Sequence, residues 1–230
     1  MLSIITLLLL ISIMNCDLLT GPEDPAADFF GVWRSKKPDN TDHWRLTMEE
    51  DMTFDIEEYR EGVFVQLADG SWEYDDDTSE LTIFIDNVLA GDNYGPPPEG
   101  QPEKLIKYAA VIKDRMLLSC LIGGNTETGT GFWEMVEQQT NVESEDNESH
   151  MVLSLNEDGT LDYEITSTAA GGPNESCEAT YTFDGNQILI SGSTDETVLA
   201  NTAYTYEIVG KGFYFSKLGD YYIFPFRLEE

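Results

Sequence analysis

Apolar and polar residues alternate along short segments from Phe29 onward, and helical periodicity is almost absent. In the clearest segment, Leu161, Tyr163 and Ile165 alternate with polar residues. The same pattern recurs in residues 71–74, 80–85, 180–183, 204–208 and 212–216. A period of two predicts strands with one apolar and one hydrated face. Strands of this kind are typical of antiparallel sheets, whereas the strands of parallel α/β cores are apolar on both faces.

Turn residues separate these segments at the spacing of sandwiches and barrels. Asp-Gly pairs at 158–159 and 184–185 predict hairpin turns, because glycine readily adopts positive φ. The proline-rich residues 93–102 are expected to form a loop. An antiparallel meander of this size protects its edges most readily by closing into a barrel. The predicted fold class is therefore all-β, and the predicted architecture is an up-and-down β-barrel.

One unit of the sequence occurs twice. Gly31-Val32-Trp33 opens the first copy and Gly131-Phe132-Trp133 opens the second. Residues 43–57 align with 150–164 without a gap, and seven of the fifteen positions are identical. An internal repeat of this length predicts two tandem antiparallel barrel modules, at 29–122 and 131–230, joined by a linker at 123–130.

The first sixteen residues form an uncharged, apolar run that ends at Cys16. The run is shorter than the roughly 20 residues of a transmembrane helix, so it is interpreted as a signal peptide followed by a linker at 17–28. Met14-Asn15-Cys16 resembles a relaxed bacterial lipobox, which implies lipidation of Cys16. Ordinary secretion and a retained anchor are the alternatives. The predicted location is the cell envelope, with the protein held to a membrane by lipid and facing the periplasm or the exterior.

The chain carries 44 acidic and 12 basic residues among 230, a formal net charge of −32. Such a surface repels nucleic acids and anionic headgroups, and both are excluded as partners. The negative charge is typical of a surface that is simply hydrated or of one that binds cations or a basic protein.

Cys120 and Cys177 do not occupy corresponding positions of the repeat. They could form a disulfide with each other or remain two buried thiols, and the sequence leaves both alternatives open.

The G-x-W motif followed by a meander resembles the lipocalin-like (calycin-type) domains of bacterial exported lipoproteins. This resemblance implies that Trp33 and Trp133 plug the floor of each barrel. It also implies that Arg115 and Arg227 pack over these indoles, a contact worth about 1 kcal/mol. A lipocalin-like cavity that holds a lipid or another small hydrophobic molecule is the alternative function considered for such a fold.

No motif for nucleophilic catalysis is present, and no enzyme activity, cofactor or metal is expected. His43 and His150 occupy the same repeat position and are predicted to face solvent, because Trp44, Leu46 and Met48 face inward. The acidic turns at 49–51, 75–77 and 143–148 are expected to be hydrated hairpin tips, with weak Ca²⁺ binding as the alternative.

Inward aromatic residues are the candidates for a ligand-lining surface. They are Phe54, Trp72, Tyr74, Tyr163, Tyr181, Phe183, Tyr206 and Phe215. In small barrels such side chains usually fill the interior. The first hypothesis is therefore a non-enzymatic, membrane-tethered lipoprotein that acts in binding or surface interaction. The alternative is a carrier of a small hydrophobic ligand or lipid. Function is expected where the copies differ, at 93–102 and 141–149.

Overall fold

The computed structural model describes residues 25–36, 43–60, 63–217 and 225–229, which form one short 3₁₀-helix and strands joined in one sheet. The helix η1 spans Pro25–Phe29. The strands are β1 Gly31–Lys36, β2 His43–Met48, β3 Thr53–Arg60, β4 Val63–Asp75, β5 Glu80–Ala90, β6 Asn93–Gly95, β7 Pro102–Ile112, β8 Arg115–Leu118, β9 Gly131–Asn141, β10 Asn147–Leu155, β11 Thr160–Ser167, β12 Glu175–Asp184, β13 Gln187–Ser191, β14 Ala203–Val209, β15 Gly212–Phe215 and β16 Pro225–Leu228.

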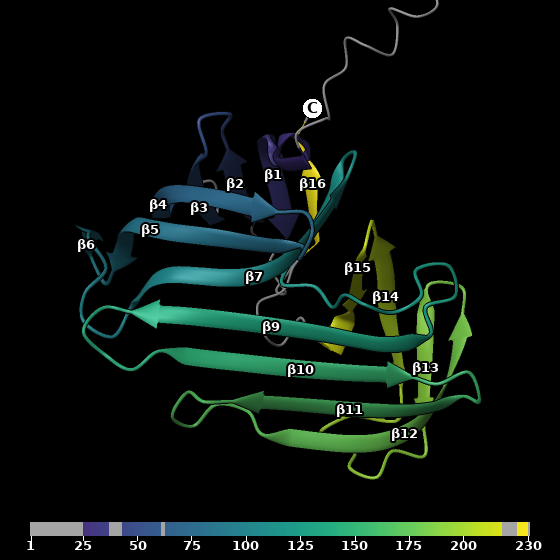
Figure 1. The fold of residues 1–230 in the computed structure, drawn as a ribbon. Coiled ribbons are helices and arrows are strands. Elements are labelled where there is room, and N and C mark those ends of the chain that lie inside the picture. Colours follow the sequence, from purple (N-terminus) through teal and green to yellow (C-terminus); the bar gives the residue numbers. More distant parts are fainter. Residues whose placement is uncertain (1–24, 37–42, 61–62, 218–224, 230) are drawn as a thin grey trace, which may run out of the picture.

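Eight antiparallel strands close into a barrel in the order β1-β2-β3-β4-β5-β7-β8-β16 (Figure 1). The closing strand comes from the C-terminus of the chain. β16 lies between β8 and β1, where Arg227 pairs with Arg115 on one side and with Arg34 on the other. The all-β antiparallel class and the closed barrel are thus confirmed, although the sequence repeat places β16 in the second unit.

β4 contains an irregularity at Gly70. The register of β4 shifts between Asp69 and Gly70, where β4 pairs with β5. A Cβ at Gly70 would lie 1.9 Å from the carbonyl oxygen of Phe84, so only glycine permits this approach. Such irregularities increase strand twist and help a sheet to close.

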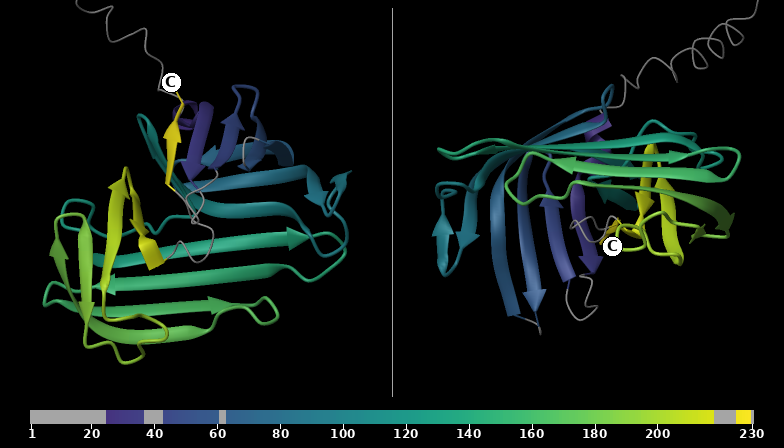
Figure 2. Two further views of the ribbon diagram at one scale, coloured as in Figure 1. Left: turned by 180° about the vertical axis from the view of Figure 1, so that it is seen from behind. Right: turned by 90° about the horizontal axis from the view of Figure 1, so that it is seen from below.

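Apart from the short edge strand β6, the remaining strands, β9 to β15, form a curved meander that continues the same sheet (Figure 2). We call this part, together with residues 121–122, the second half. β7 joins it to the barrel by pairing with β9. Leu121 exchanges two backbone hydrogen bonds with Phe213 of β15, and Ile122 exchanges two with Glu134 of β9. Residues 121–122 therefore link the last strand of the second half to its first.

The two copies of the repeated sequence share their local geometry. The indole of Trp33 donates to the carbonyl of Phe29 at 2.7 Å, and that of Trp133 donates to the carbonyl of Gly129 at 2.9 Å. Trp33 pairs with Leu46 as Trp133 pairs with Leu153. Because all described strands share one sheet, the division into two separate modules stays a prediction.

Both hairpin tips of the repeat are held by an aspartate and a threonine. Asp51 accepts hydrogen bonds from the backbone amide and hydroxyl of Thr53, and Asp158 accepts the same two from Thr160. These bonds lower the pKa of both aspartates. The carboxylates of Asp51 and Asp158 therefore find hydrogen-bond donors within their own hairpin tips.

Two local expectations change with the structure. Residues 93–95 are not loop but form β6, which pairs with the end of β5 through residues such as Tyr94 and Leu89. Proline follows only after this short edge strand, which explains why the strand can pair. Cys120 and Cys177 are both buried free thiols, so the disulfide alternative is excluded.

Candidate functional site

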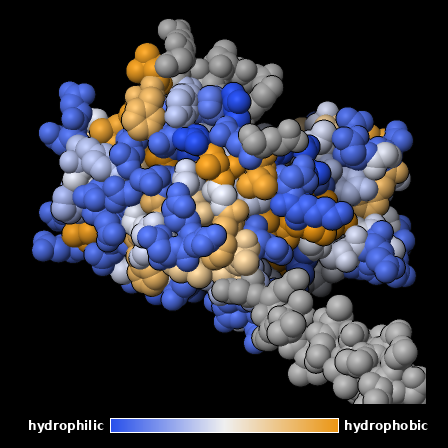
Figure 3. All heavy atoms as spheres, turned by 90° about the horizontal axis from the view of Figure 1, so that it is seen from above, coloured by the Kyte–Doolittle hydropathy of each residue, from blue (hydrophilic) through white to orange (hydrophobic). Residues whose placement is uncertain are grey.

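The first barrel contains a cavity of about 260 Å³. Its wall is almost entirely apolar and comes from β2, β3, β4, β5, β7, β8 and β16 together with Ser119. The lining residues are Trp44, Leu46, Met48, Phe54, Ile56, Ala68, Trp72, Leu81, Ile83, Ile85, Leu105, Lys107, Leu118, Ser119 and Phe226. From above, apolar side chains are visible in the middle of the surface, between hydrophilic residues (Figure 3).

Strand alternation turns these side chains inward. On β2, Leu46 and Met48 are buried, and Phe54 is buried on β3. Trp72 is 2% exposed, and its indole donates to the carbonyl of Thr53 at 3.1 Å. This bond fixes one of the two lining tryptophans, because a buried indole N–H needs an acceptor.

Lys107 and Ser119 form the polar end of the cavity. The ammonium of Lys107 donates to the hydroxyl of Ser119 at 3.1 Å and to the carboxylate of Glu137 on β9. Burial acts to raise the pKa of Glu137, but the charge of Lys107 and hydrogen bonds from Lys107, Gln139 and Ser119 outweigh it, so the pKa is lowered. Glu137 is therefore held as a carboxylate at neutral pH.

The cavity is suited to a small molecule. An engineered apolar cavity of about 150 Å³ binds benzene, whereas drug-sized ligands occupy about 300–1,000 Å³. At about 260 Å³ the barrel cavity lies between these limits.

The predicted ligand-lining aromatics divide between the two parts of the molecule. Phe54 and Trp72 line the cavity. Tyr74 packs against Phe29, with ring centroids 4.5 Å apart. Tyr163, Tyr181, Phe183, Tyr206 and Phe215 belong to the core of the second half or pack against it.

Other residues that line the cavity were not predicted as ligand-lining from the sequence. Strand parity already placed Trp44 inward, and the same parity applied to β7 identifies Leu105 and Lys107. The signal was missed because no strand was predicted over residues 102–107, whereas β7 begins at Pro102 and includes them.

The two tryptophans of the G-x-W motifs are fully buried. Arg115 pairs with Glu207 of β14, and Arg227 lies 3.9 Å from Asp114 with an exposed side chain. Both arginines thus have carboxylate partners, and their stacking on the tryptophans stays a prediction.

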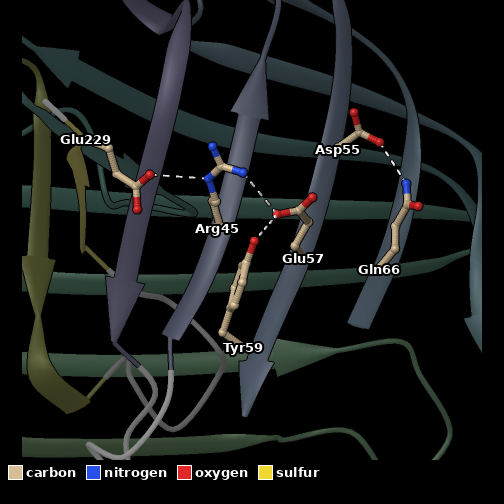
Figure 4. Close-up of polar contacts among 6 residues, drawn as sticks. All are labelled: Arg45, Asp55, Glu57, Tyr59, Gln66 and Glu229. Atoms are coloured by element: carbon tan, nitrogen blue, oxygen red, sulfur yellow. Dashed lines mark hydrogen bonds and ion pairs between the residues drawn. The ribbon is translucent and has the colours of Figure 1, made fainter. Parts of the chain in front are cut away.

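The outer face of the barrel carries a polar network (Figure 4). Arg45 contacts Glu57 at 3.4 Å and Glu229 at 3.3 Å, and Tyr59 donates to Glu57. Burial, with repulsion from Asp69 and Glu57, raises the pKa of Asp55, which accepts a hydrogen bond from Gln66. These contacts tie neighbouring strands together on the side away from the cavity.

The two histidines lie in different parts of the molecule, His43 on the barrel strand β2 and His150 on β10 of the second half. His43 stacks on Tyr59 with centroids 4.7 Å apart, and His150 contacts Glu134 at 2.6 Å. Within the described ranges, no three histidine, cysteine or acidic side chains are arranged to hold a metal ion.

Acidic side chains border a surface hollow at the turn after β4. Glu73, Asp75, Asp76 and Asp77 line it, and Lys211 of the second half donates to Asp76. The hollow is polar and open. A basic protein partner, which the charge of the chain favours, stays a prediction.

Of the acidic residues predicted as a loop at 141–149, only 142–146 connect the strands β9 and β10, and contacts within the segment order this connection. Asn141 donates to the carbonyl of Glu145 at 2.7 Å and to the carboxylate of Asp146 at 3.2 Å. The proline-rich loop docks beside it, where Gly100 donates to the carbonyl of Val142 at 2.9 Å. The two regions in which the copies differ thus meet in space.

Cys16 and the signal-peptide interpretation lie outside the described residues. Among the residues that are described, no helix has the length and apolar character needed to span a membrane.

Comparison with known proteins returns no protein family, no curated protein and no solved structure that matches this chain.

Proposed function

We propose that this protein is a non-enzymatic binding protein that holds a small apolar molecule inside its first barrel. The observation that supports this function is the cavity of about 260 Å³ with its almost wholly apolar wall. Removing apolar surface from water is favourable by about 25 cal/mol per Å². A ligand enclosed by Phe54, Trp72 and Leu46 would therefore be held mainly by the hydrophobic effect.

The second half serves this function as a scaffold. Its strand β9 extends the sheet behind β7, and its Glu137 neutralises the lysine at the polar end of the cavity. Duplication of one barrel-forming unit, followed by divergence of the interiors, accounts for the shared tryptophan anchors and hairpin tips.

We infer the cellular setting from the sequence. Lipidation of Cys16 would tether the binding domain to a membrane in the cell envelope, and secretion without a lipid is the alternative. Mass spectrometry of the mature N-terminus tests this point. An unmodified terminus away from Cys16 would end the lipoprotein proposal.

Filling the cavity tests the binding function. Ile56 lines the cavity on β3, and the repeat aligns it with Tyr163 of the second half. Ile56→Tyr therefore introduces a side chain that the corresponding position already accepts. We expect this variant to lose the binding of a small apolar probe such as toluene. Calorimetry and the fluorescence of Trp44 and Trp72 measure the binding.

Ile112→Tyr is the matched control, because it makes the same change on β7 at a side chain that is 46% exposed. It should bind the probe like the unaltered protein. Equal binding by both variants would show that the probe does not enter the barrel and would overturn the proposed function.

A further inference from the structure

We propose that the ligand of this cavity is a neutral amphiphile, whose hydrogen-bond acceptor contacts Lys107 while its apolar part fills the barrel. The inference rests on the proposed function and specifies the ligand class. It follows from the number of donors and charges at the polar end of the cavity.

Lys107 retains one donor for a ligand. Its ammonium has three N–H groups. One is directed to Ser119 and another to Glu137, and the described residues supply no third acceptor. Because Lys107 lines the cavity, a ligand oxygen within reach would complete its hydrogen bonding.

The charge of Lys107 is already balanced. Glu137 lies directly opposite on β9 and forms an ion pair with it. A ligand carboxylate would add a second negative charge to one ammonium, next to an apolar wall and in a chain of net charge −32. An unbalanced charge in such surroundings is costly, whereas a ketone, ester or hydroxyl oxygen adds none.

A cationic ligand is disfavoured at the same end. The side chains that line the cavity there are Lys107 and Ser119, whereas Glu137 lies behind the lysine. An amine would therefore meet an ammonium that has no acceptor capacity. Ser119 is 4% exposed and also donates to Glu137, so its hydroxyl reinforces the existing pair.

The experiment measures by calorimetry how the full chain binds two eight-carbon ligands, the neutral ketone 2-octanone and the carboxylate octanoate. The unaltered protein should bind 2-octanone at least about tenfold more tightly than octanoate, because only the carboxylate brings a second, unbalanced negative charge to the Lys107–Glu137 pair. Tighter binding of octanoate would overturn the inference and leave the proposed function in place.

Two variants separate the hydrogen bond from the charge. Glu137→Gln leaves the positive charge of Lys107 without a partner. Octanoate should therefore bind more tightly to this variant, while the affinity for 2-octanone should change little. The double variant Lys107→Met/Glu137→Gln removes both charges together, which avoids a buried unpaired ion. In it, 2-octanone should bind about tenfold more weakly than in Glu137→Gln.

Circular dichroism and thermal unfolding check that both variants fold. Unchanged affinity of 2-octanone in the folded double variant would overturn the contact with Lys107. Failure of the unaltered protein to bind either ligand or toluene would overturn the proposed function, and this inference with it.

Discussion

The first barrel and the second half begin with the same anchors but differ in their interiors. Trp33 and Trp133 are equally buried and make the same indole hydrogen bond to the residue four positions earlier. Both interiors contain a cluster of buried side chains, and in the first barrel such side chains also surround a cavity of about 260 Å³. The shared features set the strand arrangement, and the differing features set what the interior can hold.

Two differences lead us to expect that the core of the second half is filled. Tyr163 occupies the repeat position of Ile56 and adds an aromatic ring. The connection between β13 and β14 also inserts Val198 and Leu199 into the core of the second half. The corresponding residues after β5 instead run outward as β6 and the proline-rich loop (Figure 1).

The tryptophans test the shared part of this comparison and carry the largest expected effect. Trp33→Ala and Trp133→Ala should each lower the free energy of unfolding by about 3–5 kcal/mol, because each removes a fully buried indole. Urea denaturation of the two variants measures the loss. A cost below about 1 kcal/mol for either one would show that the two anchors are not equivalent.

Leu199 tests the part that differs. Its side chain is fully buried, so Leu199→Ala should cost about 2–5 kcal/mol and leave a cavity in the second half. Such apolar cavities stay dry and accept small apolar molecules, so the variant should bind a second equivalent of toluene. Leu189→Ala is the control, since Leu189 is 36% exposed on the neighbouring strand β13. A single equivalent in the Leu199 variant would contradict the filled-core explanation.

The outer carboxylates give the smallest effect. Burial and repulsion raise the pKa of Asp55, so its ionised form opposes folding at neutral pH and this cost disappears as the pH falls toward about 4. Asp55→Asn should therefore be slightly more stable than the unaltered protein at neutral pH, with the difference shrinking on acidification.

The pKa of Asp51 is shifted in the opposite direction, so this residue serves as the control. Hydrogen bonds to Thr53 lower its pKa, so its contribution is present above the unfolded pKa of about 3.9 and is lost as the pH falls through the folded pKa. Asp51→Asn should be less stable at neutral pH. Thermal unfolding across this pH range checks both variants, and destabilisation by Asp55→Asn at neutral pH would contradict the assigned sign.

Much of the fold follows from local sequence signals. Period-two alternation located strands such as β11, and the Asp-Gly pair at 158–159 located its turn, because both signals lie within a few residues. The closure by β16 depends on contact between residues almost 200 positions apart, such as Trp33 and Leu228. No local pattern encodes that pairing.

The cavity was predictable only in part. Parity identified Phe54 and Trp72 as inward residues, and both line it. Parity cannot tell a filled interior from a hollow one, because that depends on how a loop such as residues 192–202 folds over the end of the sheet. The same limit explains why five aromatics of the second half looked like ligand-lining residues in the sequence and prove to belong to its core.

The central claim is that the first barrel is hollow and the second half is filled. Xenon binds dry apolar cavities, and its electron density marks them directly in a crystal under xenon pressure. The account predicts xenon among Leu46, Phe54 and Trp72 and none within the core around Tyr163 and Leu199. Xenon in that second core, or an empty first barrel, would contradict it.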